Sequence, residues 1–244
     1  MLLGTAWRHY KGSNVEALKD IASRVELVTF DCYGTLIDWN TGIRGVLERI
    51  VGECGVADRV AVEDLLAAYV STEAGVEAQA WRPYRRVQAE TLLRLAEQFQ
   101  LSLLPEHRDL LAETLPDWLP FADTCPALVQ LKARFKLGIL SNIDRDLFAR
   151  TARHFPVGFD LVVTAEDVRA YKPAHAHFLR GLDRVRQDRS RLLHVAESAY
   201  HDGIPTSQLG LPWVWINRTG SANRHGAEPV AEFSDLESFV RTIG

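Results

Sequence analysis

Length, composition and charge set the outer limits for this chain. It has 244 residues, of which 47% are hydrophobic and 25% are charged, and its net charge is −4. These values are ordinary for a soluble globular protein that can bury a core as one large domain or two smaller ones. The sequence has no basic run and no interleaving of basic with aromatic residues, so we expect a small-molecule partner and no nucleic acid.

The cysteines and the N-terminal segment bear on the compartment. Cys32, Cys54 and Cys125 are odd in number and widely spaced, which fits a reducing compartment without a disulfide framework. The first residues are too few and too polar for a secretory signal, and no uncharged apolar stretch reaches about 18 residues. We therefore expect a cytoplasmic protein with no membrane partner.

The first predicted elements are a helix over Val15–Arg24 and an apolar strand over Glu26–Phe30. Between Thr41 and about Leu115 the apolar residues then recur at helical spacing, with no strand pattern. This stretch predicts three or four helices. Its limits are expected near Trp39 and near two prolines at positions 116 and 120.

The later part of the chain alternates strands with helices. Four short apolar segments predict strands: Lys136–Leu140, Phe159–Thr164, Leu192–Val195 and Trp213–Ile216. Such alternation is typical of an α/β protein with a doubly wound, Rossmann-like parallel sheet. We therefore predict a core domain of residues 1–39 and 117–244, and a helical insertion of residues 40–116 after the first strand.

Polar side chains follow the predicted strands. In chain order they are Asp31 just before Gly34, Ser141 with Asn142, Lys172 ahead of Pro173, and Glu197 with Asp202. Because parallel strands bring their carboxyl ends to one edge of the sheet, we expect these side chains to lie together. Plainer interpretations stay open: Asp31 can cap a turn, and Lys172 can be a solvated or simply ion-paired lysine.

The segment Phe30-Asp31-Cys32-Tyr33-Gly34-Thr35-Leu36, followed by these residues in this order, resembles the haloacid dehalogenase superfamily. That superfamily carries a nucleophilic Asp, a Ser or Thr, a Lys and an acidic pair, and the resemblance spans nearly the whole chain. The sequence looks most like the branch of the 2-haloacid dehalogenases and the azetidine-2-carboxylate hydrolase. The resemblance implies that the helical insertion closes over substrate as a cap, and it is compatible with a homodimer.

A carboxylate is already deprotonated near neutral pH, and covalent attack divides one hard displacement into two easier steps. The resemblance implies that Asp31 attacks the substrate and that water then cleaves the ester. Asp202, which matches an Asp of the dehalogenases, is the leading candidate for the base in that second step. Lys172 would offset the charges of Asp31 and of the substrate, because two like charges ~4 Å apart repel by roughly 4 kcal/mol at an effective dielectric of ~20.

Three further side chains are candidate hydrogen-bond donors. Thr35, Ser141 and Asn142 can donate to a substrate carboxylate or to the attacking oxygen, aided by backbone N–H groups at the helix start after Ser141. Each can instead be a plain cap.

Tyr33 bears on the choice between two reactions. In phosphatases of this superfamily the second position after the nucleophile is an Asp that protonates the leaving group, whereas a Tyr with a pKa of about 10 is a poor general acid near neutrality. A halide, or a strained-ring amine that enters as an ammonium, leaves without that acid. The sequence thus favours a hydrolase that cleaves a C–X bond of a small α-substituted carboxylate, unless Tyr33 only packs against the insertion.

Departures from the dehalogenase pattern leave the leaving group open. Phe178 stands where those enzymes carry a Tyr, Ala199 where they carry an Asn, and Glu197 where they carry a Ser. Glu197 suits a cationic amine on the substrate. In the alternative reading, a magnesium-dependent small-molecule phosphatase, Asp31, Glu197 and Asp202 would hold Mg²⁺. Otherwise no cofactor is expected, and a non-catalytic binding protein is the third hypothesis.

The helical insertion is expected to supply selectivity. Its run Trp81-Arg82-Pro83-Tyr84-Arg85 joins aromatic faces to guanidinium groups and suits the clamping of a small carboxylate. Arg82 and Arg85 are the candidates, although most arginines on such helices face solvent. Trp39 is expected to form an apolar wall or to hinge the insertion.

Overall fold

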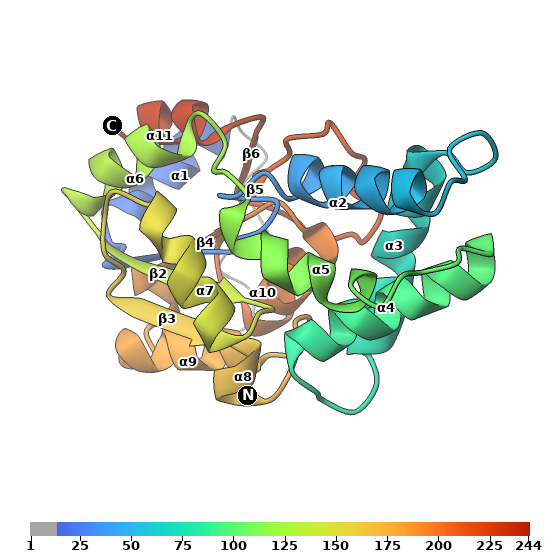
Figure 1. Ribbon diagram of the computed structural model, residues 1–244. Coiled ribbons are helices and arrows are strands. Elements are labelled where there is room, and N and C mark those ends of the chain that lie inside the picture. The colour runs from blue at the N-terminus through green and yellow to red at the C-terminus, as the bar shows by residue number, and fades with distance from the viewer. Residues whose placement is uncertain (1–13) are drawn as a thin grey trace.

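The computed structural model describes residues 14–244, in which a parallel sheet is covered by helices, with a further group of helices to one side (Figure 1). The sheet has six strands in the order β3-β2-β1-β4-β5-β6, and every neighbouring pair is parallel. In that order they are Leu161–Thr164, Lys136–Ser141, Leu27–Phe30, Leu192–Ala196, Trp213–Ile216 and Ala231–Phe233. The predicted α/β class with a doubly wound parallel sheet is confirmed.

Strand β1 lies at the centre, between β2 and β4. Its last residue, Phe30, is aligned with Ile139 on one side and Val195 on the other. Every residue of β1 and β4 is buried, which explains why these segments are continuous apolar runs rather than alternating ones. Asp31 follows β1 directly and so leaves the sheet in the middle of its carboxyl edge.

Strand β6 was missed by the sequence analysis. It is three residues long, lies at the edge of the sheet and buries only Ala231 fully. The segment Ala231-Glu232-Phe233 has no apolar run, so its pairing with β5 defines it as a strand.

Helices cover both faces of the sheet. Those of the core are α1 (Asn14–Ala22), α6 (Thr124–Lys132), α7 (Arg145–Thr151), α8 (Ala165–Val168), α9 (Ala176–Arg184), α10 (Ile204–Leu209) and α11 (Leu236–Ile243). On one face α1, α6 and α11 pack together, and on the other α9 packs on β2 and β3 (Figure 1). Successive residues of β1 enter different apolar clusters, with Leu27 beside α9 and Val28 on the opposite face. The predicted helix over Val15–Arg24 corresponds to α1.

Between β1 and α6 the chain is helical. The elements are α2 (Trp39–Glu53), α3 (Val62–Glu77), α4 (Tyr84–Phe99), α5 (His107–Thr114) and a short 3-10 turn over Leu115–Asp117. Helix α3 packs along α4, and α4 packs along α5. The four helices lie beside the sheet rather than on either of its faces (Figure 1).

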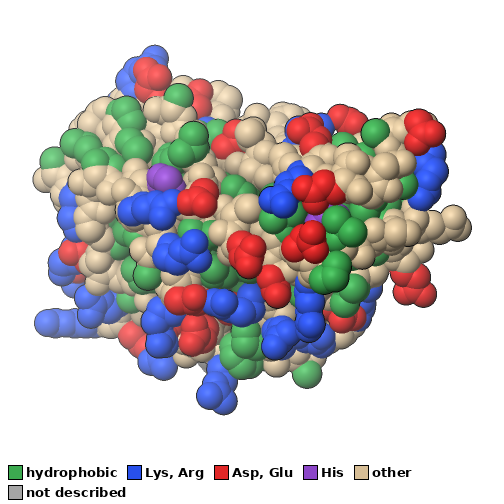
Figure 2. Space-filling view, in the orientation of Figure 1, with side chains coloured by type: hydrophobic (Ala, Val, Ile, Leu, Met, Phe, Trp, Pro, Cys, Tyr) green, Lys and Arg blue, Asp and Glu red, His purple; other side chains and the backbone are tan. Residues whose placement is uncertain are grey.

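The surface carries charges of both signs. In Figure 2 the Lys and Arg side chains are interspersed with Asp and Glu over the face shown, with no large area of one sign. Within residues 14–244, no helix combines the length and the apolar character needed to cross a bilayer.

The start of α2 packs tightly on the chain that returns to the core. A Cβ added at Gly42 would lie 2.3 Å from the indole ring of Trp118, which is buried. We expect Gly42→Ala to lower the free energy of unfolding by about 1–3 kcal/mol, because the ring has to move. Gly45 on the same helix has nothing within 4 Å of such a Cβ, so Gly45→Ala is expected to raise it by roughly 0.5–1 kcal/mol. Urea denaturation of both variants checks this, and equal stabilities would contradict the packing.

Candidate active site

Asp31 is held where β1 gives way to a tight turn. Its N–H donates to the Val195 carbonyl at 3.2 Å, which extends the pairing of β1 with β4 by one residue. Gly34 adopts φ +95°, a conformation that glycine tolerates and that lets the chain reverse. The turn brings the Thr35 hydroxyl to within 3.1 Å of Asp31 Oδ2, to which it donates. The Asp31 side chain keeps 12% of its surface exposed and is therefore still reachable.

Lys172 joins Asp31 to Asp202. Its ammonium donates to Asp31 Oδ1 at 2.8 Å, to Asp202 Oδ1 at 2.7 Å and to the Leu140 carbonyl at 2.9 Å. All three donor hydrogens are thus used, and the side chain is only 1% exposed. Burial by itself would lower the pKa of Lys172, but the charges of Asp202 and Asp31 outweigh it and raise the pKa, so the group stays cationic.

Asp202 is completely buried and lies in the π-helical turn after β4, which spans Ala199–Gly203. Its Oδ1 also accepts a hydrogen bond from His194 Nε2 at 2.8 Å. Its Oδ2 has no hydrogen-bond partner among the described residues. Burial tends to raise the pKa of Asp202, yet Lys172 and the His194 hydrogen bond hold it below its usual value, so the carboxylate is charged near neutrality.

The three predicted donors lie close to these acids but are engaged differently. Thr35 donates to Asp31, and its oxygen accepts the Glu197 N–H at 2.9 Å. Asn142 forms two hydrogen bonds with the Lys172 backbone. Its Oδ1 accepts from the Lys172 N–H at 2.7 Å, and its Nδ2 donates to the Lys172 carbonyl at 3.2 Å. Asn142 therefore positions Lys172. Ser141 is buried, and its backbone carbonyl accepts from His177 Nε2 at 3.3 Å.

Tyr33 points toward α7, where its hydroxyl forms a 2.7 Å hydrogen bond with Thr151 Oγ1. Burial, followed by the charge effects of Cys32 and Asp31, raises the pKa of Tyr33 well above its ordinary value. A phenol in this state does not protonate a leaving group near neutral pH.

Glu197 places a further carboxyl group beside Asp31. Its Oε2 lies 3.9 Å from the position that a Cβ on Gly34 would occupy. Burial, and then the charges of Asp31 and Asp202, raise the pKa of Glu197 to about 7, against the opposing effects of His201 and Arg218. The group is therefore divided between its charged and neutral forms near neutrality.

The two predicted arginines are engaged elsewhere. Arg82 bonds to Gln79 and to the Ala80 carbonyl within its own loop. Arg85 is 44% exposed and pairs with Asp146 at 2.6 Å and with Asp144 at 3.3 Å, both at the start of α7. Neither guanidinium forms a hydrogen bond or an ion pair with Asp31; both are engaged by acids, an amide or a carbonyl of the protein.

Trp39 and Phe178 each pack against another ring. Trp39 begins α2 and packs against Tyr69 with ring centroids 5.9 Å apart. Phe178 is fully buried on α9, where its ring meets that of His194 edge-on at 5.1 Å. An aromatic residue so deep in the core supports the strand beneath the site and has no route to a substrate.

An acidic group on α3 escaped the sequence analysis. Glu73 accepts hydrogen bonds from the hydroxyls of Tyr69 at 2.7 Å and Tyr84 at 2.8 Å. Glu77 accepts from Asn142 at 3.3 Å and lies 3.5 Å from His201 Nε2. The four-residue spacing of Tyr69, Glu73 and Glu77 places them on one helix face, and this was the available signal.

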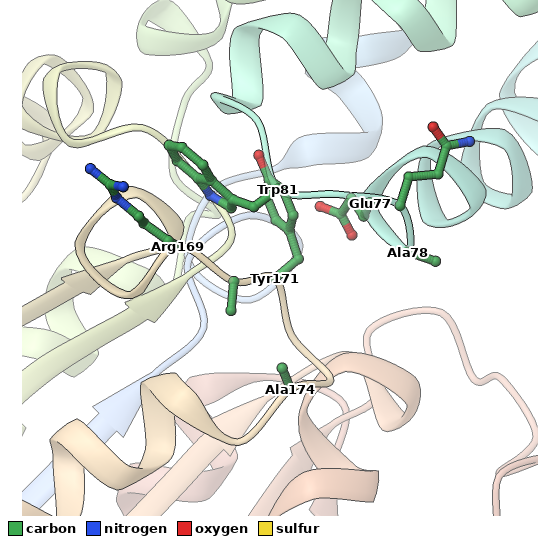
Figure 3. Close-up of a pocket in the computed structure, with 8 residues that line it drawn as sticks. Glu77, Ala78, Trp81, Arg169, Tyr171 and Ala174 are labelled. Atoms are coloured by element: carbon green, nitrogen blue, oxygen red, sulfur yellow. The ribbon is translucent and has the colours of Figure 1, made fainter.

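Two cavities lie between this part of the insertion and the core. The larger, about 300 Å³, is bordered by Trp81 and Arg169 on one side of Tyr171 and by Glu77 on the other (Figure 3). The guanidinium of Arg169 lies 5.7 Å from the Trp81 ring centroid. The smaller cavity, about 60 Å³, is lined by Glu77, Tyr171 and Lys172 among others. The shared lining residues indicate an approach to Lys172 from the side of α3.

An Asp, a Lys and a second Asp joined at the carboxyl edge of a parallel sheet, next to a helical insertion after the first strand, define a hydrolase of the haloacid dehalogenase type. Residues 25–200 match the family model described as haloacid dehalogenase-like hydrolase. The chain belongs to this family, as its sequence motifs predicted, and it is an enzyme.

Individual relatives are known from sequence and from structure. The chain is 26% identical to an (S)-2-haloacid dehalogenase of Pseudomonas putida over 210 residues, which cover 81% of this chain and 87% of the relative. It is also 26% identical over 222 residues to the enzyme of that name from Pseudomonas sp. strain YL, covering 87% and 92%. The L-2-haloacid dehalogenase of Xanthobacter autotrophicus with chloropropionic acid covalently bound shares the fold, with a TM-score of 0.75 at 18% identity over 90% of this chain and 98% of that one. A magnesium-bound HAD-hydrolase from Bacillus subtilis has a TM-score of 0.75 at 17% identity, covering 90% and 99%.

The acids of α3 predict a dependence of stability on pH. Burial and the charge of Glu77 raise the pKa of Glu73 to about 7, although the tyrosine hydrogen bonds and His201 oppose this. The folded protein therefore binds a proton here that the unfolded chain releases, and the free energy of unfolding falls as the pH rises from about 4.5 to 7. We expect Glu73→Gln to remove this loss. Relative to the unaltered protein, the free energy of unfolding of the variant should be higher at pH 8 than at pH 5 by on the order of 2 kcal/mol.

Thermal or urea denaturation at both pH values checks this expectation. Glu97→Gln on the exposed side of α4 is the matched control and is expected to change stability equally at both pH values. An equal effect of Glu73→Gln at the two pH values would contradict the assignment.

Proposed function

We propose that this chain cleaves a C–X bond of a small α-substituted carboxylate through a covalent ester on Asp31. The observation that carries the proposal is the sharing of one ammonium, that of Lys172, by the carboxylates of Asp31 and Asp202. One carboxylate can then act as nucleophile while the other serves as base. The similarity to (S)-2-haloacid dehalogenases supports this reaction type. A fold relative that holds chloropropionic acid covalently supports the ester.

The proposed reaction has two steps. First, a carboxylate oxygen of Asp31 bonds to the α-carbon while the C–X bond breaks and its electron pair leaves with X. Water then attacks the carbonyl carbon of the ester and gives a proton to Asp202, whose unpartnered Oδ2 suits this task. The bond from that carbonyl carbon to the substrate oxygen breaks, and the departing oxygen takes up the proton. Asp31, now with one oxygen from water, releases the second proton of that water to solvent and is regenerated as a carboxylate. Neither step requires a cofactor.

The leaving group is a halide or the amine of a strained ring. Tyr33 supplies no proton near neutrality, and neither a halide nor an amine that enters as an ammonium needs one. The neighbouring side chains Glu197 and Glu77 would attract a positively charged ring nitrogen and repel a departing halide. Because of this charge distribution, the proposed reaction includes azetidine-like ring opening as well as dehalogenation.

A magnesium-dependent phosphatase is the second candidate, favoured by the third carboxyl group that Glu197 adds to Asp31 and Asp202. Within residues 14–244, no three His, Cys, Asp or Glu side chains are arranged to hold a metal ion. The ammonium of Lys172 already bonds to both aspartates. The residues as placed do not fit the ion.

We expect added MgCl₂ to leave the turnover of α-substituted carboxylates unchanged. Generic phosphomonoesters with MgCl₂ are expected to release no phosphate above the level of the Asp31→Asn variant. Phosphate assays on both proteins check this. Release that depends on magnesium and is lost in Asp31→Asn would establish the phosphatase instead.

A single turnover in heavy-oxygen water tests the covalent step. We expect one heavy oxygen in the peptide that carries Asp31, because water attacks the ester carbonyl there and not the substrate carbon. Asp31→Asn should abolish turnover, while Asp202→Asn should slow it by about 10²–10⁴-fold and let the ester accumulate. Peptide and intact-protein mass spectrometry report both results.

The matched control is Asp160→Asn, which removes an Asp–Lys pair with Lys132, 2.6 Å apart, just ahead of β3 at the opposite edge of the sheet. Its turnover is expected to match that of the unaltered protein. Heavy oxygen found only in the released product, with none in the Asp31 peptide, would contradict the proposed ester intermediate.

A further inference from the structure

His194 begins a hydrogen-bonded chain that the two-step reaction above does not use. It lies in β4 and is fully buried, directly across from Thr29 of β1. Its Nδ1 lies 2.9 Å from the Thr29 hydroxyl oxygen, and its Nε2 lies 2.8 Å from Asp202 Oδ1. Both ring nitrogens are therefore engaged, one by the central strand and one by the second acid of the site.

The partner of Nε2 defines the role of that nitrogen. A carboxylate only accepts hydrogen bonds, so Nε2 carries a proton and donates to Asp202 Oδ1. The edge-on ring of Phe178, 5.1 Å away, fills the space beside the imidazole. His194 is thus held in one orientation, with its Nε2–H directed at Asp202.

This direction matters for the free oxygen of Asp202. His194 and Lys172 both donate to Oδ1, and Oδ2 has no partner among residues 14–244. Without the second donor on Oδ1, Lys172 alone would hold the carboxylate, which would then rotate about its Cβ–Cγ bond. That rotation would turn away the acceptor that a water molecule needs.

We propose that His194 is a positioning residue, which holds Asp202 so that Oδ2 stays free to accept the proton of the attacking water. The inference rests on the proposed covalent function and concerns its second step only. Attack by Asp31 does not depend on the free oxygen, so the two steps should respond differently when His194 is changed.

The test compares His194→Phe, which keeps a ring but removes the N–H, with His194→Gln, which keeps a donor. With a substrate that forms the ester, we expect kcat of His194→Phe to fall at least tenfold while kcat/KM stays within threefold, because only ester hydrolysis slows. The ester should accumulate on Asp31 in the mass spectrum of the intact protein. His194→Gln should keep kcat within threefold of the unaltered protein.

Two further variants separate positioning from folding. His107→Gln removes another fully buried histidine that bonds to a carboxylate, Glu53, at 2.6 Å, and it should leave kcat and the ester level unchanged. Thr29→Val removes the hydroxyl at Nδ1 with little change of shape, and it should shift kcat in the same direction as His194→Phe. This variant also serves if His194→Phe does not fold.

A parallel loss of kcat and kcat/KM in His194→Phe, or an equal loss in His194→Gln, would overturn the inference. If the unaltered protein forms no ester with any substrate, the proposed function fails, and a crystal structure of His194→Phe or Thr29→Val then decides on His194 alone. An Asp202 carboxylate rotated from its orientation in the unaltered protein supports positioning. An unmoved Asp202 contradicts it.

Discussion

The ammonium of Lys172 lies between two carboxylates in a part of the molecule that water hardly reaches. Without this cation, Asp31 and Asp202 would meet as like charges, a repulsion of several kcal/mol at such separations. The third hydrogen bond of Lys172, to the Leu140 carbonyl, ties the ammonium to β2, and Asn142 fixes the backbone of the lysine. One cation thus joins the ends of three strands, and the charge state of the whole site depends on it.

The helical insertion contacts the core through polar groups at the same edge of the sheet. Glu77 reaches Asn142, which in turn holds Lys172, while Arg85 binds the acids at the start of α7. Asn142 and Arg85, which the sequence suggested as donors to a substrate carboxylate, are therefore also bonded to groups of the protein itself. The side chain that the insertion turns toward Lys172 and His201 is acidic, so the insertion adds a negative charge at this point.

The sequence predicts features that depend on neighbouring residues in the chain, and it misses those that depend on contacts between distant segments. Strands with continuous apolar runs were identified because burial on both faces leaves a clear pattern, whereas β6 has none and depends on its partner β5. The polar residues that follow the strands could be placed at one edge because parallel strands share a direction. His194 was taken for a buried strand residue, which it is, yet its burial is what makes its two hydrogen bonds effective.

By itself, the sequence determined the α/β class and indicated the helical insertion, because strand and helix periodicity are local properties of the chain. The order of its motifs, through the family resemblance, made Asp31, Lys172 and Asp202 the candidates. Only the tertiary structure decided which atoms meet. Lys172 and Asp31 are separated by 141 positions in the chain, and His194 receives its partners from β1 and from the turn after β4. The orientations of the Arg82 and Arg85 side chains depend on residues close in space, which the spacing of residues in the sequence does not reveal. Side-chain rotamers respond to the nearest partners in space, and the folded chain alone brings those partners together.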